Sequence, residues 1–121
     1  MQNQKLNTIQ KRENLNEVHR IGGPGPGGAC HEYMIVSAEG QNILEHIQFQ
    51  KGRRGAQDSV PGVCDQDLLE IVRDRLTAFQ NGPMPCPQNI RALMYVEQAL
   101  IQLNERVEDR IERGVLGTME K

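Results

Sequence analysis

The sequence predicts an α+β protein in which a small antiparallel β-hairpin or sheet is followed by a long antiparallel hairpin of two helices. Two observations predict this class. Residues 31–36 are rich in aromatic and β-branched side chains, and residues 43–51 alternate between two faces, as half-buried strands do. Residues 65–113 instead repeat their apolar side chains every three to four positions, as amphipathic helices do.

The 121 residues are expected to form a single domain in four parts. These parts are an N-terminal arm (1–21), a Gly/Pro loop and β region (22–63), the helical hairpin (64–114) and a tail (115–121). The first part is rich in Asn and Gln with few apolar residues. It is compatible with a frayed arm or with a short helix that docks on a neighbour, and the sequence leaves both open.

The stretch IGGPGPGGACHEY, residues 21–33, satisfies the dinucleotide fingerprint G-x-G-x-x-G over residues 23–28. That fingerprint works when a helix follows the glycines, because the helix N-terminus then faces the pyrophosphate. Here residues 31–36 predict a strand, and the two prolines of the loop lack the N–H groups that a phosphate nest needs. We therefore exclude a Rossmann loop and interpret the stretch as a joint.

The β region is expected to form a hairpin. One strand is predicted over residues 32–37, a turn over 38–41 and a second strand over 43–51. A basic, flexible loop over residues 52–58 follows the second strand.

Two helices are predicted from signals at both of their ends. Asp65 and Asp67 suit the first turn of a helix that stops at Asn81-Gly82-Pro83. Pro87 suits the first position of a longer helix that runs to Arg113, where Gly114 caps it. The first helix carries an apolar stripe of Leu68, Leu69, Val72, Leu76 and Phe79. The second carries a heptad seam of Leu93, Val96, Leu100, Leu103 and Val107, which Asn89 and Arg110 continue at its two ends.

Composition limits the classes of function. Hydrophobic content of 37% and aromatic content of 3% predict a thin core. A single chain would bury little apolar surface, so we expect subunits to associate and share a hydrophobic core. A net charge of −2 and a pI near 5.9 argue against nucleic-acid polymers and membrane surfaces as partners, so an anionic ligand needs a local basic cluster.

Cysteine usage and the N-terminus point to a reducing compartment. Cys30, Cys64 and Cys86 are odd in number and widely spaced, which favours free thiols over disulfides or a zinc site. We expect no metal and no cofactor. No apolar signal segment and no run of membrane-spanning length occur, so a soluble intracellular protein is expected.

Three arginines are the first candidates for a binding site. Arg106, Arg110 and Arg113 are spaced i, i+4 and i+7 on one helical face, where guanidinium groups can grip phosphates. On spacing alone, a solvated face paired with neighbouring carboxylates is the favoured alternative.

Other candidates also carry alternatives. Phe79 can stack on a base or close the hairpin core, and Asn89 can contact a base edge or hydrogen-bond the hairpin turn. Arg54, next to a second arginine between glycines, can clamp an anion or stay solvated. Catalysis has little support, because no serine lies in a nucleophile context and the three histidines are scattered.

Three segments together resemble the phage-encoded Thoeris anti-defence proteins over about residues 22–118. They are GPGPGGACHEY, DQDLLEIVRDRLTAFQNGP and CPQNIRALMYVEQALIQLNERVEDRIERGVLGT. The family pattern is a GPGGA-x-H-x-Y loop and strand, a helix ending in FQxGP, and a long helix that opens with C-x-x-N and ends at paired arginines. The helical hairpin is also similar to that of the anti-CBASS sponges.

The resemblance implies sequestration without turnover of a cyclic ADP-ribose isomer (gcADPR) that a bacterial TIR enzyme makes, in the cytoplasm of the infected host. It implies that Phe79 stacks on the adenine, that Asn89 lies in the pocket, and that Arg106 and Arg110 grip the phosphates, with Arg113 extending their face. It also implies homodimers formed through the helices, and a hexamer made of three such dimers.

A second ligand class, cyclic di- or trinucleotides of CBASS, is implied at a separate site between dimers, for which we expect Gly25, Gly27, Gly28 and Arg54. The family's usual C-x-E-N-A is replaced here by Cys-Pro-Gln-Asn-Ile over residues 86–90, a change at the mouth of the expected pocket. Two other classes stay open: an enzyme that cleaves the same signal, and a helical-hairpin module that binds a host protein through an apolar patch.

Overall fold

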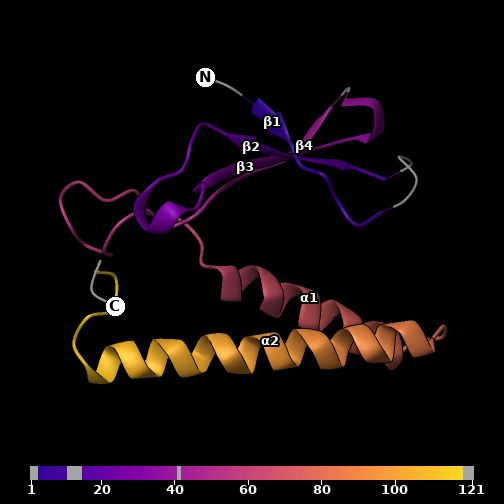
Figure 1. Cartoon of the computed structure of the whole chain (residues 1–121). Coiled ribbons are helices and arrows are strands. Elements are labelled where there is room, and N and C mark those ends of the chain that lie inside the picture. The colour runs from indigo at the N-terminus through magenta and orange to yellow at the C-terminus, as the bar shows by residue number, and fades with distance from the viewer. Residues whose placement is uncertain (1–2, 11–14, 41, 119–121) are drawn as a thin grey trace. The chain divides into compact units, whose positions relative to one another are not determined.

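The computed structural model describes residues 3–10, 15–40 and 42–118. The chain divides after Val63 into two compact units, a β unit and a helical unit. Figure 1 labels their elements. A four-stranded antiparallel sheet precedes two helices, so the predicted α+β class is confirmed.

The strands of the β unit follow one another across the sheet in the order β1-β2-β3-β4. They are β1 (Asn3–Lys5), β2 (Glu17–Ile21), β3 (Glu32–Val36) and β4 (Ile43–Gln48). The predicted hairpin is β3 and β4, although β4 ends three residues earlier than the predicted strand. Beyond it, Phe49 and Lys51 form only single bridges, to Val63 and Val60.

The N-terminal part differs from both of its expected forms, since it contributes two strands. β2 pairs with β3 along its length, with His19 opposite Met34 and Arg20 opposite Tyr33. Histidine, arginine and asparagine are weak signals of a strand, so the pairing partner decides the structure here and not local preference. The part of the arm at residues 11–14 lies outside the described residues.

The apolar interior of the β unit is small. Among the described residues only Ile21 and Val36 are buried hydrophobic side chains, at 8% and 4% exposure. Tyr33 and Phe49 add an edge-to-face aromatic pair with ring centres 5.6 Å apart. So thin a core fits the low hydrophobic content of the sequence.

The glycine-rich loop forms a short 3₁₀ turn, η1 (Pro26–Gly28), that leads into β3 and not into a helix. The N–H of Gly25 donates to the carbonyl of Ala29 at 2.8 Å, and that of Gly28 to the carbonyl of Gly25 at 2.9 Å. Two of the loop's amides are therefore used within the loop. A second 3₁₀ turn, η2 (Ala38–Gly40), lies at the position of the predicted turn between β3 and β4.

The helical unit consists of α1 (Asp65–Gln80) and α2 (Pro87–Glu112). Cysteines cap both N-termini. Cys64 forms a capping box with Asp67, and the Sγ of Cys86 accepts from the backbone N–H of Asn89 at 3.4 Å. α2 ends one residue before the predicted Arg113, which is its C-cap, and Gly114 follows with φ +71°.

The heptad seam of α2 is its less exposed face, as predicted, because all five seam residues are half-buried. The stripe of α1 is only partly covered: Leu68, Leu69 and Leu76 are half-buried, whereas Val72 and Phe79 are 41% and 47% exposed. No helix in the described part of the chain is long and apolar enough to cross a membrane.

Candidate functional site

Phe79 stands at the turn end of the helical hairpin, one residue before α1 ends. Its ring is 47% exposed, so it does not close the hairpin core. The guanidinium carbon of Arg75, one helical turn earlier, lies 5.3 Å from the ring centre. Because Arg75 lies over one face of this exposed ring, the ring and the cation together offer a stacking surface for a planar group.

Asn89 lies across the hairpin turn, in the first turn of α2. Its side chain is half-buried, and its backbone N–H is held by the Cys86 cap. The backbone N–H of Cys86 in turn donates to Oε1 of Gln80 at 3.0 Å, which ties the turn to the end of α1. The amide of Asn89 therefore projects from a well-fixed piece of backbone.

The three arginines lie at the opposite end of α2 and differ from one another. Arg106 is exposed to solvent. Arg113 is 46% exposed and donates from Nε to Oδ2 of Asp109 at 3.1 Å. Arg110 is only 6% exposed and is the one buried residue of either helix.

The guanidinium of Arg110 is held by the segment that follows α2. Its Nη2 donates to the carbonyls of Val115 and Thr118, each at 2.9 Å. These bonds add a structural role to Arg110 that its spacing in the sequence did not indicate.

The two groups of candidate residues are far apart within one chain. Asn89 and Arg106 are seventeen positions apart on the continuous helix α2, which is about 25 Å at 1.5 Å per residue. Phe79 lies at the same end as Asn89, where the connection between the antiparallel helices turns (Figure 1). One chain therefore does not bring both groups around one small ligand.

A groove of about 630 Å³ lies between the two helices, and none of the predicted site residues lines it. Its walls include the carboxylates of Glu70, Glu97 and Glu105. Arg73 lies among them, and its hydrogen bonds to Glu97 and Glu70 raise the pKa of its guanidinium. Three carboxylates against one arginine make this groove unfavourable for a phosphate. In the sequence, Met94 and Ile101 are apolar residues of α2 that lie outside the heptad seam, and this position off the seam was the signal for the groove.

In the β unit, the expected second nucleotide site is spread over two loops. Gly25 packs closely, since a Cβ placed on it would lie 3.0 Å from Nδ1 of His31, whereas Gly27 and Gly28 have open space at that position. Arg54 is exposed in the loop after β4. A neighbouring cavity of about 240 Å³ is lined by Gly22, Gly23, His31 and Lys51, among others, and by none of these four predicted residues.

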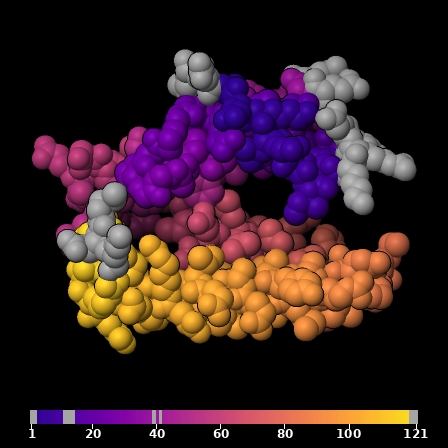
Figure 2. All heavy atoms as spheres, in the orientation of Figure 1, coloured from indigo at the N-terminus to yellow at the C-terminus, as the bar shows by residue number. Residues whose placement is uncertain are grey.

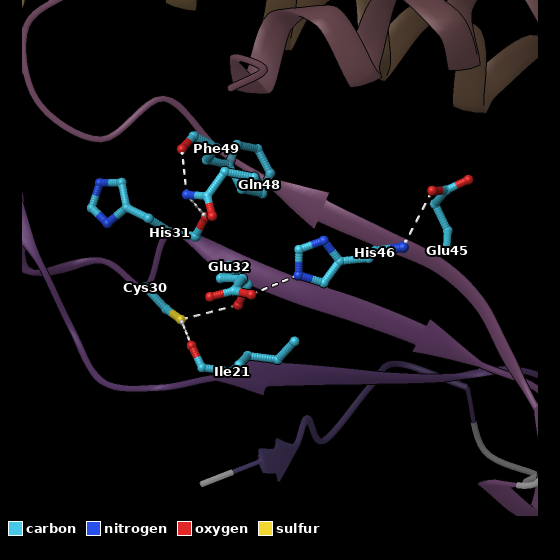
Figure 3. A network of polar contacts seen from close by, with 8 residues as sticks. All are labelled: Ile21, Cys30, His31, Glu32, Glu45, His46, Gln48 and Phe49. Carbon is cyan, nitrogen blue, oxygen red and sulfur yellow. Dashed lines mark hydrogen bonds and ion pairs between the residues drawn. The ribbon is translucent and has the colours of Figure 1, made fainter. Parts of the chain in front are cut away.

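Polar contacts around the start of β3 are structural in character (Figure 3). The thiol of Cys30 donates to the carbonyls of Ile21 and Glu32, both at 3.3 Å. A ring nitrogen of His46, Nε2, lies 2.6 Å from Oε2 of Glu32, and the side chain of His46 is 52% exposed. Among residues 3–10, 15–40 and 42–118, no group of three or more His, Cys, Asp and Glu side chains could hold a metal ion.

Comparison with known proteins relates this chain to a phage protein. No family model matches the chain. A protein named "Thoeris anti-defense 1" from Bacillus phage SBSphiJ7 is 36% identical over 97 residues, which are 80% of this chain and 66% of that protein. The chain belongs to the Thoeris anti-defence family. Membership of the Thoeris anti-defence family supports a role in phage anti-defence, while the chain spans about two thirds of this relative's length.

Proposed function

We propose that this Thoeris anti-defence protein binds and sequesters the cyclic ADP-ribose isomer gcADPR in the host cytoplasm, without degrading it. Phe79 stacks on the adenine, Asn89 bonds to the ligand's polar edge, and Arg106 and Arg110 hold the diphosphate, with Arg113 beside them. The observation that carries the proposal is the exposure of an aromatic ring at one end of the hairpin and of an arginine at the other. Base stacking and charge-assisted phosphate contacts are the two interactions that such a nucleotide needs.

A site of this kind requires two copies of the chain. Because the two groups lie about 25 Å apart along α2, an antiparallel pair of hairpins brings Phe79 and Asn89 of one copy to the arginines of the other. Exposed apolar side chains along both helices could form such an interface. They are Ile71, Val72, Ile90, Met94, Tyr95, Ile101 and Ile111. Figure 2 draws one face of the molecule, including these helices, with all heavy atoms as spheres. A homodimer, and a hexamer of three dimers, are part of the proposal.

Binding without turnover is favoured over cleavage, because the arginine end of α2 carries no histidine that could serve as general base. Cyclic di- or trinucleotides of CBASS are proposed as a second ligand class, held near Gly25, Gly27, Gly28 and Arg54. The helical-hairpin module remains the second candidate function, since the exposed apolar side chains would also fit a host protein.

The first experiment incubates the protein with gcADPR, removes free nucleotide by filtration and heats the protein. Intact gcADPR that is released only on heating, and is identified by mass spectrometry, supports sequestration. A fragmented nucleotide would identify an enzyme. No captured nucleotide would reject gcADPR as the ligand and leave cyclic oligonucleotides or a host protein.

A complementation experiment tests the two-copy site. Phe79→Ala and Arg106→Ala chains carry different affinity tags, are co-expressed, and are purified through both tags. In a shared site, one of the two pockets in the mixed dimer has an intact Phe79 and an intact Arg106, so half of the wild-type capacity returns. If each site lies within one chain, every pocket carries a lesion and capacity does not return.

A further inference from the structure

Arg110 is a buried cation that has no acidic partner among the described residues. It is the single buried polar or charged side chain among the described residues, at 6% exposure. None of the ion pairs within residues 3–10, 15–40 and 42–118 includes it. Its guanidinium is satisfied instead by two backbone carbonyls, those of Val115 and Thr118. A buried charge held only by neutral acceptors is a costly arrangement that an anion would relieve.

The segment that supplies these carbonyls is a well-built turn over residues 113–118, called the C-terminal turn below. The N–H of Val115 donates to the carbonyl of Arg110 and that of Gly114 to the carbonyl of Ile111, each at 3.0 Å. With Gly114 in the left-handed region, these two bonds make a Schellman motif. Thr118 closes the turn, since its N–H and its Oγ1 both donate to the carbonyl of Val115, at 3.0 and 2.7 Å.

The two bonds use the nitrogen that phosphate recognition needs most. A guanidinium grips an oxyanion bidentately through one of two edges, either Nε with Nη2 or Nη1 with Nη2. Nη2 belongs to both edges, and its two hydrogens point to the carbonyls of Val115 and Thr118. In this arrangement, Arg110 is buried and has no complete edge to offer to a phosphate.

We propose that the C-terminal turn is a latch that competes with the ligand's phosphate for Arg110, so that capture of a nucleotide requires the turn to open. This inference rests on the proposed function. A diphosphate offers Arg110 an opposite charge and a bidentate acceptor, which the neutral carbonyls of Val115 and Thr118 do not, and this favours the exchange once ligand arrives. Only chains in which Arg110 is released can bind the phosphate. The apparent affinity for the ligand is therefore the affinity of the open form multiplied by the fraction of chains that are open.

The latch can be loosened at Gly114 without touching the guanidinium. A Cβ on Gly114 meets no atom within 4 Å, so a side chain there acts only through the backbone angle φ of +71°. Gly114→Val forbids that angle, whereas Gly114→Asn tolerates it and is the matched control. We expect Gly114→Val to bind gcADPR about five- to tenfold more tightly than wild type, and Gly114→Asn to bind like wild type.

Two measurements report on the state of the latch without replacing any residue that is proposed to contact the ligand. Without ligand, phenylglyoxal should modify Arg110 slowly in wild type and quickly in Gly114→Val, with Arg106 equally reactive in both, as mapped by peptide mass spectrometry. With gcADPR bound to wild type, amide exchange at Val115 and Thr118 should become faster. Thr118→Val, with Thr118→Ser as its control, is a second way to loosen the turn if Gly114→Val fails to fold.

The outcomes separate the latch from the proposed function. Equal or weaker binding in Gly114→Val and Thr118→Val, with wild type capturing the nucleotide, overturns the latch and leaves sequestration standing. Amides of the turn that stay protected with ligand bound overturn it as well. A wild-type chain that captures no gcADPR removes the proposed function, and the latch with it, whatever the variants do.

Discussion

Arg73 on α1 donates from Nε to Oε2 of Glu97 on α2 at 2.9 Å, and within residues 3–10, 15–40 and 42–118 this is the one side-chain ion pair that joins the two helices. Both side chains are substantially exposed, at 48% and 40%, so water screens the pair. We expect Glu97→Gln to lower the melting temperature by at most a few degrees. The difference in melting temperature between wild type and Glu97→Gln should be smaller in 1 M salt, where exposed charges are screened. Thermal unfolding of both chains at two salt concentrations checks this, and a loss that is independent of salt would contradict it.

Arg106 should contribute to ligand binding and little to stability, because it is exposed on α2. Arg106→Ala removes a charge-assisted contact to phosphate, so we expect gcADPR binding to weaken about ten- to a hundredfold. Arg91→Ala removes another exposed arginine, from the other half of α2, and serves as the matched control. Calorimetric titration measures both affinities. Equal affinities for the two variants would reject Arg106 as a ligand residue.

Gly62 is required by close backbone packing in the β unit. A Cβ on Gly62 would meet the carbonyl oxygen of Gln48 and lie 2.5 Å from the carbonyl carbon of Phe49. Backbone atoms cannot move aside as a side chain does, so Gly62→Ala should destabilise the β unit by about 3 kcal/mol or more. Gly23→Ala is the control for a mere change of residue type, because a Cβ on Gly23 meets no atom within 4 Å and Gly23 does not have a positive φ. Urea unfolding of the two variants compares them, and equal midpoints would contradict the packing argument.

Acid should weaken the β unit through Glu17. A hydrogen bond from His19 and the nearby charge of Lys5 lower the pKa of the Glu17 carboxyl below its ordinary 4.5, against the opposing effect of burial. A lowered folded-state pKa gives stability that is complete above the unfolded-state pKa and lost as the pH falls through the folded-state value. We therefore expect stability to decline below about pH 4.5 and Glu17→Gln to flatten that decline. Amide exchange in β2 between pH 3 and 6 reports it, and identical profiles for both chains would refute it.

The helical unit was largely predictable because its signals are local. Asp65 in the first turn, Pro87 at the start of α2 and Gly114 after its end each act on the backbone within a few residues. The heptad seam identifies the less exposed face of α2, because helical periodicity alone decides which side chains share a face. The family could also be recognised from these segments.

The N-terminal strands and the state of Arg110 were not predictable in this way. β2 is a strand because β3 supplies its hydrogen-bond partners, since its five residues mix the strand formers Val18 and Ile21 with residues of weak preference. Arg106 and Arg110 are four residues apart, a spacing that places both on one helical face and predicts the same exposure for both. Arg110 is nevertheless buried, and the turn after α2 folds back to bond its guanidinium.

The sequence by itself determined the β3–β4 hairpin, the two helices with their ends, and the candidate residues for nucleotide binding. Each of these depends on interactions between near neighbours in the chain. Only the tertiary structure decided that β2 pairs with β3 and that the carbonyls of Val115 and Thr118 hold Arg110. Those relationships depend on where the chain returns in space, which local periodicity and residue type do not encode.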